Sequence, residues 1–278
     1  MRQRRRTDVA RPALPLSRKL RQRPVTAKHF PAPARCSPEH YPTPVDKSGS
    51  RVRRMFGEIA GRYDLLNRLL SLSLDRRWRR RTVRLVPPSG EGPVLDVCTG
   101  TADLALAYCR AGGRGVRVVG ADFCRPMLAI ARRKARRAKG DHHLALVEAD
   151  AERLPFPDEA FEIVSVAFGL RNVSDTDRGL REMVRVCRPG GRVAVLEFSL
   201  PEAWPLRTLY GWYFRHVLPA VGQGLARNRQ AAYNYLPQSV DEFPQREDLV
   251  RRMRSAGLSE VRFHPFTFGV ALLYVGVK

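Results

Sequence analysis

Short apolar runs alternate with amphipathic segments through most of the chain beyond residue 90. The apolar runs are rich in Val, Leu and Ile, which is typical of buried strands, and the segments between them have a helical period. Strands that alternate with helices predict a parallel sheet covered by helices on both faces. The predicted strands are 93–97, 116–122, 146–151, 161–167, 192–198, 261–263 and 272–277. The last two form a closing hairpin, so we expect an α/β fold with a seven-stranded, mostly parallel sheet and an antiparallel last strand.

Two further segments have a helical pattern outside this alternation. Residues 51–90 predict two or three helices that form a cap over the mouth of the site. One interpretation is an amphipathic cap with Trp78 in the core and the arginines of 75–81 solvated. The other is a lid whose Tyr63 and Asn67 line the site and whose basic end contacts lipid headgroups. Residues 201–245 predict an aromatic-rich helical insert, either packed in the core or holding an apolar ligand.

The charge is concentrated at the N-terminus. Residues 1–54 hold fifteen Lys and Arg against three Asp and Glu, and so supply +12 of the net charge of +23. Residues 1–50 are rich in Arg, Pro and Ser without an apolar period, which predicts a disordered basic extension ahead of a domain over 51–278. The extension resembles a transit peptide or is an idle addition. The rest of the chain is still basic, which suits an anionic surface, either nucleic acid or lipid headgroups.

The turn after the first predicted strand is the best candidate for a binding loop. It follows Asp96 and contains Gly100 between small residues, so that the backbone can approach a ligand closely. It lacks the G-x-x-x-x-G-K-[ST] pattern of phosphate-binding loops and the G-x-G-x-x-G pattern of dinucleotide sites. An ordinary strand-to-helix turn is the alternative interpretation.

Acidic residues end three successive strands and favour one type of ligand. Asp122 ends the second strand, where a carboxylate accepts hydrogen bonds from ribose hydroxyls. Asp150 follows the third strand and can accept from an adenine amino group, with the Ala151 N–H directed at the ring. With Asp96, the three acids suit a ligand that combines ribose, adenine and a cationic tail. S-adenosylmethionine is such a ligand; solvated acids at helix N-termini would explain any one of the three.

Cysteine usage and hydropathy exclude several other classes. Five cysteines occur without a C-x-x-C pair, so we expect reduced core thiols in a cytoplasmic protein and no metal site. No apolar run approaches the roughly 18 residues of a membrane span.

From about Met55 to Lys278 the chain resembles the menaquinone/ubiquinone biosynthesis C-methyltransferases. Three segments carry the resemblance: Y-D-L-L-N with the downstream Trp78, F-G-L-R-N, and R-P-G-G, at 63–67, 168–172 and 188–191. The first two together are specific to the family, whereas R-P-G-G is shared by many methyltransferases. The resemblance implies a Rossmann-like class I fold that uses S-adenosylmethionine.

The resemblance also implies residue roles. The family's cofactor residues fall on Thr101, Asp122 and Asp150–Ala151, to which the strand-end argument adds Asp96 and Gly100. The loop departs from the family's G-T-G-D because Ala102 replaces a glycine, and we expect alanine to fit if its φ is negative. The implied reaction transfers a methyl group to a ring carbon of a polyprenylated naphthoquinol, converting demethylmenaquinol to menaquinol. The predicted catalytic residues are Arg171, which stabilises phenolate charge, and Tyr63, Asn67 and Asn172, which orient the ring.

Several alternatives stay open at this stage. His216 is a candidate base or a packed side chain. The substrate is alternatively a benzoquinol precursor of ubiquinone, or RNA or protein on the same fold, and a non-catalytic binding protein is a further alternative. We expect a polyprenylated quinol as partner, no nucleic acid, and contact with the inner face of the membrane. A homodimer is compatible with the sequence, which leaves the oligomeric state open.

Overall fold

The computed structural model describes residues 46–71, 73–138, 143–202 and 230–278, together with residues 204, 208 and 211. These residues belong to one compact unit, Tyr41–Lys278. The predicted extension over 1–50 lies outside the described residues except at its end, as does most of the predicted insert over 201–245. The proposed division of the chain at residue 50 therefore stays a prediction.

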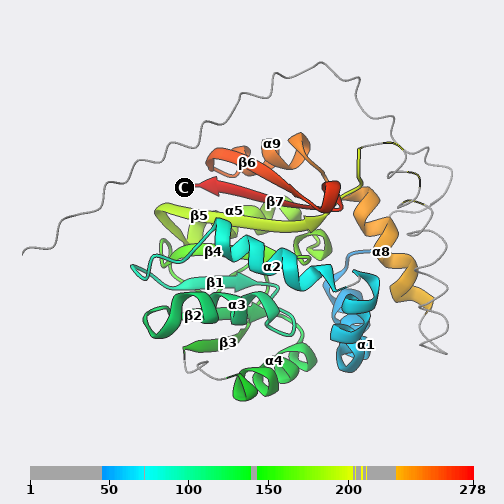
Figure 1. Ribbon diagram of the computed structural model, residues 1–278, viewed down its shortest axis with the longest axis horizontal. Coiled ribbons are helices and arrows are strands. Elements are labelled where there is room, and N and C mark those ends of the chain that lie inside the picture. The colour runs from blue at the N-terminus through cyan, green and yellow to red at the C-terminus, as the bar shows by residue number, and fades with distance from the viewer. Residues whose placement is uncertain are drawn as a thin grey trace, which may run out of the picture. The chain divides into compact units, whose positions relative to one another are not determined.

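A single seven-stranded sheet organises the described residues (Figure 1), with the strand order β3-β2-β1-β4-β5-β7-β6. Six strands run in one direction, and β7 is antiparallel to both of its neighbours. This confirms the predicted α/β class and the closing hairpin. The strands are β1 Val94–Val97, β2 Val118–Asp122, β3 Leu144–Glu148, β4 Phe161–Ala167, β5 Cys187–Phe198, β6 Ser259–Phe266 and β7 Ala271–Val277.

Helices cover both faces of this sheet and bury a separate apolar core on each. One core joins strand residues to the apolar sides of α5 and α9. The other joins the opposite strand residues to α2, α3 and α4. The alternation is visible along β1, where Leu95 and Val97 enter the first core and Val94 enters the second. The helices are α1 Gly49–Leu70, α2 Leu74–Leu85, α3 Asp103–Gly112, α4 Arg125–Arg137, α5 Thr176–Val186, α8 Gln230–Glu242 and α9 Glu247–Ser255. The described residues also contain the 3₁₀ turns η2 Gly113–Gly115, η3 Leu170–Asn172 and η5 Thr267–Gly269.

The R-P-G-G segment at 188–191 lies inside β5, which begins ahead of the strand predicted over 192–198. The helix ends at Val186, and β5 already begins at Cys187, which pairs with Phe161. Pairing of β4 with β5 then shifts, so that Ile163 pairs with Arg192. Residues 188–191 therefore form a bulge within β5 that lies opposite the single β4 residue Glu162. Gly190 has φ 71°, a conformation that glycine adopts without steric cost.

In the described residues, the segment 51–90 forms two helices, where two or three were predicted. The apolar and Tyr-containing segments of 52–67 form one continuous helix, α1, and the basic run forms α2. Among the described residues, no helix is long and apolar enough to cross a membrane.

Candidate active site

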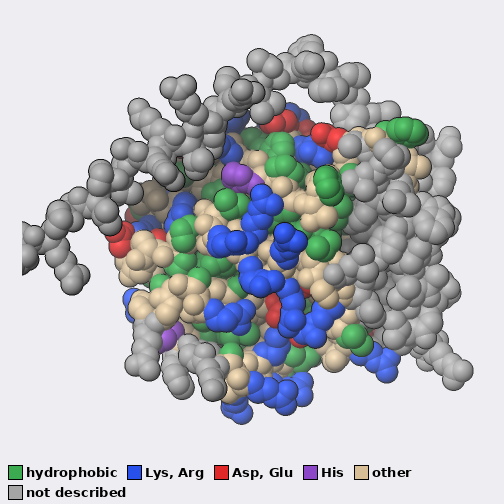
Figure 2. All heavy atoms as spheres, in the orientation of Figure 1, with side chains coloured by type: hydrophobic (Ala, Val, Ile, Leu, Met, Phe, Trp, Pro, Cys, Tyr) green, Lys and Arg blue, Asp and Glu red, His purple; other side chains and the backbone are tan. Residues whose placement is uncertain are grey.

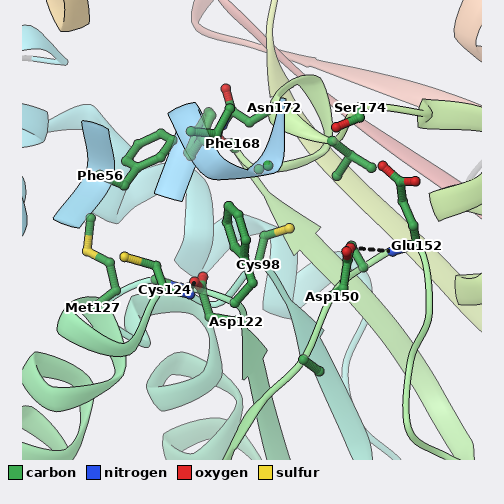
Figure 3. Close-up of a pocket in the computed structure, with 18 of the residues that line it drawn as sticks. Phe56, Cys98, Asp122, Cys124, Met127, Asp150, Glu152, Phe168, Asn172 and Ser174 are labelled. Carbon is green, nitrogen blue, oxygen red and sulfur yellow. Dashed lines mark hydrogen bonds between the residues drawn. The ribbon is translucent and has the colours of Figure 1, made fainter. Parts of the chain in front are cut away.

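A cavity lies where α1 meets the carboxyl ends of the central strands (Figure 3), and it encloses about 750 Å³ including its open mouth. This is the edge at which open α/β sheets bind ligands. Figure 3 shows Cys124 and Met127 on one side, and Asp150 and Glu152 on the opposite side. The cavity brings together six of the predicted site residues: Tyr63, Gly100, Asp122, Asp150, Ala151 and Asn172.

Asp122 is held at the end of β2 by two backbone donors. Its Oδ2 accepts from the Gly100 N–H and its Oδ1 from the Cys124 N–H, both at 2.8 Å. Burial raises the pKa of this carboxyl, and the two hydrogen bonds oppose that shift. A carboxylate has about four acceptor positions, so each oxygen can accept one more hydrogen bond. The carboxylate therefore suits a pair of neighbouring ribose hydroxyls.

The loop between β1 and α3 has an unusual backbone. Gly100 has φ 55°, and a Cβ added there would lie 4.0 Å from the Tyr63 ring. Cys98 and Ala102 also have positive φ, 51° and 66°. The expectation that alanine fits at 102 with negative φ is therefore wrong. Its left-handed conformation costs about 1–2 kcal/mol and is tolerated in a fully buried position.

Two residues that we expected to bind cofactor are outside the cavity lining. The Asp96 carboxylate is buried behind the loop, where its Oδ2 accepts from the Thr99 hydroxyl at 2.7 Å and from the Ala105 N–H at 3.1 Å. The Thr101 hydroxyl donates to Asp64 at 2.6 Å. Both side chains make these hydrogen bonds within the protein and so help to fix the shape of the loop. Their cofactor-binding roles stay predictions.

Asp96 gives the fold a testable pH dependence. Burial raises the pKa of its carboxyl to about 7, against the lowering effect of the Thr99 hydrogen bond. The pKa in the unfolded chain is near 4, so ionisation of Asp96 destabilises the folded state as the pH rises from about 4 to about 7. Asp96→Asn is neutral throughout and keeps an acceptor. We expect the stability of the wild type relative to this variant to decline over that range, as measured by urea unfolding at several pH values. Parallel pH profiles for the two proteins would exclude Asp96 as the titrating group.

Asp150 and Ala151 line the opposite wall. The Asp150 carboxylate accepts from the Glu152 N–H at 2.9 Å, and its side chain is exposed. The predicted adenine contacts are thus accessible from the cavity. Ala151 is buried, which leaves its backbone as the part available to a ligand.

The remaining lining is apolar, and most of it was not predicted. Phe123 lies in the turn between β2 and α4, Met127 lies in the first turn of α4, and Phe168 directly follows β4. Phe123 directly follows Asp122, the candidate for ribose binding. This adjacency in the sequence could have identified Phe123 as a residue of the cavity lining. Burial and the neighbouring carboxylates raise the pKa of the Cys98 thiol, so this lining cysteine is not a thiolate nucleophile.

The α1 helix is fastened to the binding loop by a polar cluster. Lys134 of α4 donates to Asp64 at 2.9 Å, to Thr101 at 3.0 Å and to Asp103. These contacts hold the preceding residue, Tyr63, over the loop. The Tyr63 hydroxyl is hydrogen-bonded to the side chain of Asn67, and burial raises its pKa. Asn67 lies behind Tyr63 rather than in the cavity wall.

The η3 turn brings polar groups to the end of the cavity near β4. Asn172 lines the cavity, whereas Arg171 points behind the wall, where its Nη1 donates to Glu197 at 2.8 Å and to the Phe168 carbonyl at 2.6 Å. Arg171 and Glu197 are both buried, so the two charges form a desolvated pair. The phenolate-stabilising role of Arg171 stays a prediction, and the structure places it behind the wall.

Unpartnered polar atoms gather near this turn. Arg171 Nε, Asn172 Oδ1 and the Tyr235 hydroxyl are buried and have no hydrogen-bond partner within the described part of the chain. The helix α8, which carries Tyr235, packs against η3. Buried polar groups are normally satisfied, so this group of atoms is consistent with binding an oxygen-bearing ligand. Tyr235 was not predicted as a site residue, and His216 lies outside the described residues.

These features fit S-adenosylmethionine. The Asp122 carboxylate has free acceptor positions for ribose, Asp150 and the Ala151 backbone are suited to adenine, and Gly100 lets the loop approach closely. The apolar lining would exclude water from the methyl group. Of the unpartnered polar atoms, Asn172 Oδ1 belongs to a residue of the cavity lining.

Comparison with known proteins agrees with the geometry. The ubiE/COQ5 methyltransferase family matches residues 45–278. A demethylmenaquinone methyltransferase of Thermus thermophilus is 52% identical over 80% of this chain and 99% of that relative. A ubiquinone/menaquinone biosynthesis C-methyltransferase of Geobacter sulfurreducens is 45% identical over 84% of this chain and 91% of that relative.

Solved structures support the fold. A SAM-dependent methyltransferase of Thermotoga maritima is similar with a TM-score of 0.54 and 20% identity, over 82% of this chain and 99% of that one. A Haemonchus contortus phosphoethanolamine N-methyltransferase in complex with S-adenosylmethionine has a TM-score of 0.53 and 14% identity, over 73% of this chain and 52% of that one. From sequence and fold together, the chain is an S-adenosylmethionine-dependent methyltransferase and belongs to the ubiE/COQ5 methyltransferase family.

Proposed function

We propose that the enzyme methylates a ring carbon of demethylmenaquinol, a polyprenylated naphthoquinol, to give menaquinol. The named activity of the Thermus thermophilus relative supports this substrate. The observation in the cavity that carries the proposal is that acids suited to ribose and adenine share the lining with aromatic and amide side chains. Figure 3 shows Phe168 and Asn172 at a second end, away from Asp122 and Asp150. Tyr63 lies beside Gly100 of the binding loop.

The chemistry needs an activated carbon nucleophile. Bound S-adenosylmethionine supplies an electrophilic methyl group on a positively charged sulfur. Loss of a proton from a quinol hydroxyl would push electron density onto the adjacent ring carbon, which would accept the methyl group. The thioether S-adenosylhomocysteine would leave, and the methylated carbon would lose its proton to restore the aromatic ring. The protein therefore has to align the ring, exclude water and stabilise phenolate charge.

We assign these tasks to the residues around the second end. Tyr63 and Phe168 offer faces for the ring, and the free Asn172 Oδ1 is available to accept from a quinol hydroxyl. The buried guanidinium of Arg171 supplies positive charge behind the wall, fixed by Glu197. Charge that is fixed before the reaction stabilises a developing phenolate without reorganisation.

A benzoquinol precursor of ubiquinone is the second candidate substrate. The Geobacter sulfurreducens relative is named for both the ubiquinone and the menaquinone pathway. A benzoquinol presents a similar hydroxyl beside a ring carbon. The polar groups at the second end would contact this hydroxyl in the same way in a one-ring benzoquinol and in a two-ring naphthoquinol.

The test is methyl transfer from labelled S-adenosylmethionine by the full chain. Demethylnaphthoquinol kept reduced, the benzoquinol precursor and total RNA are offered in parallel. Label in the naphthoquinol alone supports the proposal, and label in both quinols widens it to two pathways. Label in RNA and in neither quinol would overturn it.

A further inference from the structure

The outward face of α2 consists of arginine. Five side chains on it are exposed, whereas the opposite face buries Trp78, Thr82 and Val83 in the core. Their spacing follows the i, i+4 rows of a helix, so they share one side. Figure 2 shows Lys and Arg side chains gathered over α2. The five are Arg76, Arg77, Arg80, Arg81 and Arg84.

These arginines lack acidic partners. None of the five forms an ion pair within the described part of the chain, although exposed arginines elsewhere do, as Arg252 does with Asp177 and Arg251 with Asp248. The guanidinium of Arg81 instead lies over the Phe266 ring, 4.7 Å from its centroid. The face is therefore a concentrated positive charge. In α4, Arg125 pairs with Glu148, but the exposed Arg132, Arg133 and Arg136 also form no ion pair among the described residues, so charge alone does not identify a docking surface.

A strained aromatic tip beside α2 supplies the second observation. Phe268 of η5 is 81% exposed and has φ 56°, which is a rare conformation for a bulky residue. Thr267 before it also has a positive φ, 46°. The Thr267 hydroxyl accepts from the Trp78 indole N–H at 2.9 Å, which ties the tip to the basic helix. The fold thus holds an apolar ring in water at a cost in backbone energy.

The tip lies at the same edge of the sheet as the cavity. The tip directly follows the last residue of β6. Strand β6 runs parallel to the central strands, whose carboxyl ends form the cavity. A Cβ placed on Gly269 would lie 3.8 Å from the Cα of Pro201. Trp204, three residues further along, is 83% exposed. Two large aromatic side chains are therefore exposed in segments that meet at this edge.

We propose that the α2 face and the η5 tip together dock the enzyme on an anionic phospholipid surface. The five arginines would contact headgroups, and Phe268 would enter the boundary between headgroups and acyl chains, where amphipathic and aromatic groups are favoured. An outward helix face is convex, whereas single-stranded nucleic acid is bound in a basic groove that follows its backbone. Docking in this way brings the cavity edge to the lipid in which a prenylated quinol dissolves. That consequence rests on the proposed function, but the docking does not.

The test measures binding of the full chain to lipid vesicles without any quinol. Vesicles of phosphatidylcholine with about 30% phosphatidylglycerol are compared with pure phosphatidylcholine by co-sedimentation. The variant Arg77→Gln, Arg80→Gln, Arg84→Gln should lower the partition coefficient on anionic vesicles about 100-fold, since each arginine contributes roughly fivefold. Phe268→Asn should lower it about tenfold, also in about 0.5 M salt, where charge is screened. Asparagine tolerates the positive φ of this position.

A matched variant on α4 provides the control. Arg132→Gln, Arg133→Gln, Arg136→Gln removes the same charge from exposed positions and should change the partition coefficient less than threefold. The N-terminal segment is identical in all proteins and cancels from the comparison. Unfolding midpoints of all variants, and their methylation of a short-chain water-soluble quinol, should stay at the wild-type value.

Two results would overturn the proposal. The first is an equal loss of vesicle binding in the α2 and α4 variants, because binding would then depend only on net charge. The second is tight binding of single-stranded RNA that Phe268→Asn weakens while vesicle binding is unchanged. Failure of the quinol assay would leave the vesicle result standing, so the two proposals can fail separately.

Discussion

Asp122→Ala is expected to raise the dissociation constant of S-adenosylmethionine about 100-fold or more. The carboxylate is buried at the cavity wall, with one acceptor position free on each oxygen. Hydrogen bonds to a charged acceptor contribute about 1.5–3 kcal/mol each, and two ribose hydroxyls would lose theirs together. Isothermal titration of the full chain with S-adenosylmethionine measures the effect directly.

The same substitution also removes the acceptor of two backbone donors, so the controls must separate binding from folding. Asp122→Asn keeps one oxygen and should weaken binding by less than Asp122→Ala does. Asp177→Ala removes an exposed acid of α5 outside the cavity lining and should leave cofactor affinity unchanged. Cofactor affinity within threefold of the wild type in folded Asp122→Ala would refute the ribose assignment.

The acids at the strand ends could be predicted because two simple rules place them. Hydrophobic period located β1, β2 and β3, and the carboxyl ends of parallel strands meet at one edge of a sheet. Asp122 and Asp150 therefore had to be near one another. The rules do not give the direction of a side chain within a turn. Asp96 and Thr101 are outside the cavity lining, and the loop after Asp96 takes positive φ at Cys98, Gly100 and Ala102, which no local pattern indicated.

The buried pair of Arg171 with Glu197 was beyond the reach of sequence reasoning for a different reason. The two residues are 26 positions apart, and their contact depends on the pairing of β4 with β5. That register is set after the R-P-G-G bulge, which the sequence suggested was a simple turn. The exposure of Phe268 could not be predicted from the sequence either, because an apolar residue next to a strand is ordinarily expected in the core.

Arg171→Ala is expected to lower turnover at saturating cofactor about 100-fold or more, with the dissociation constant of S-adenosylmethionine within about threefold of the wild type. Arg171 is outside the cavity lining that suits the cofactor, and it lies directly before Asn172 at the substrate end. Fixed charge near a developing oxyanion commonly contributes 10²- to 10³-fold to turnover. Quinol methylation at saturating cofactor, together with cofactor titration, separates the two quantities.

The buried pair complicates the single substitution, because a lone Glu197 carboxylate in the core destabilises the fold by about 3–5 kcal/mol. The double variant Arg171→Met, Glu197→Gln removes both charges and should recover most of that stability in urea unfolding. It should not recover turnover, because the positive charge is still missing. If the double variant regains activity along with stability, Arg171 has a structural role only. Equal loss of turnover and of cofactor binding in Arg171→Ala would likewise place the residue outside the chemical step.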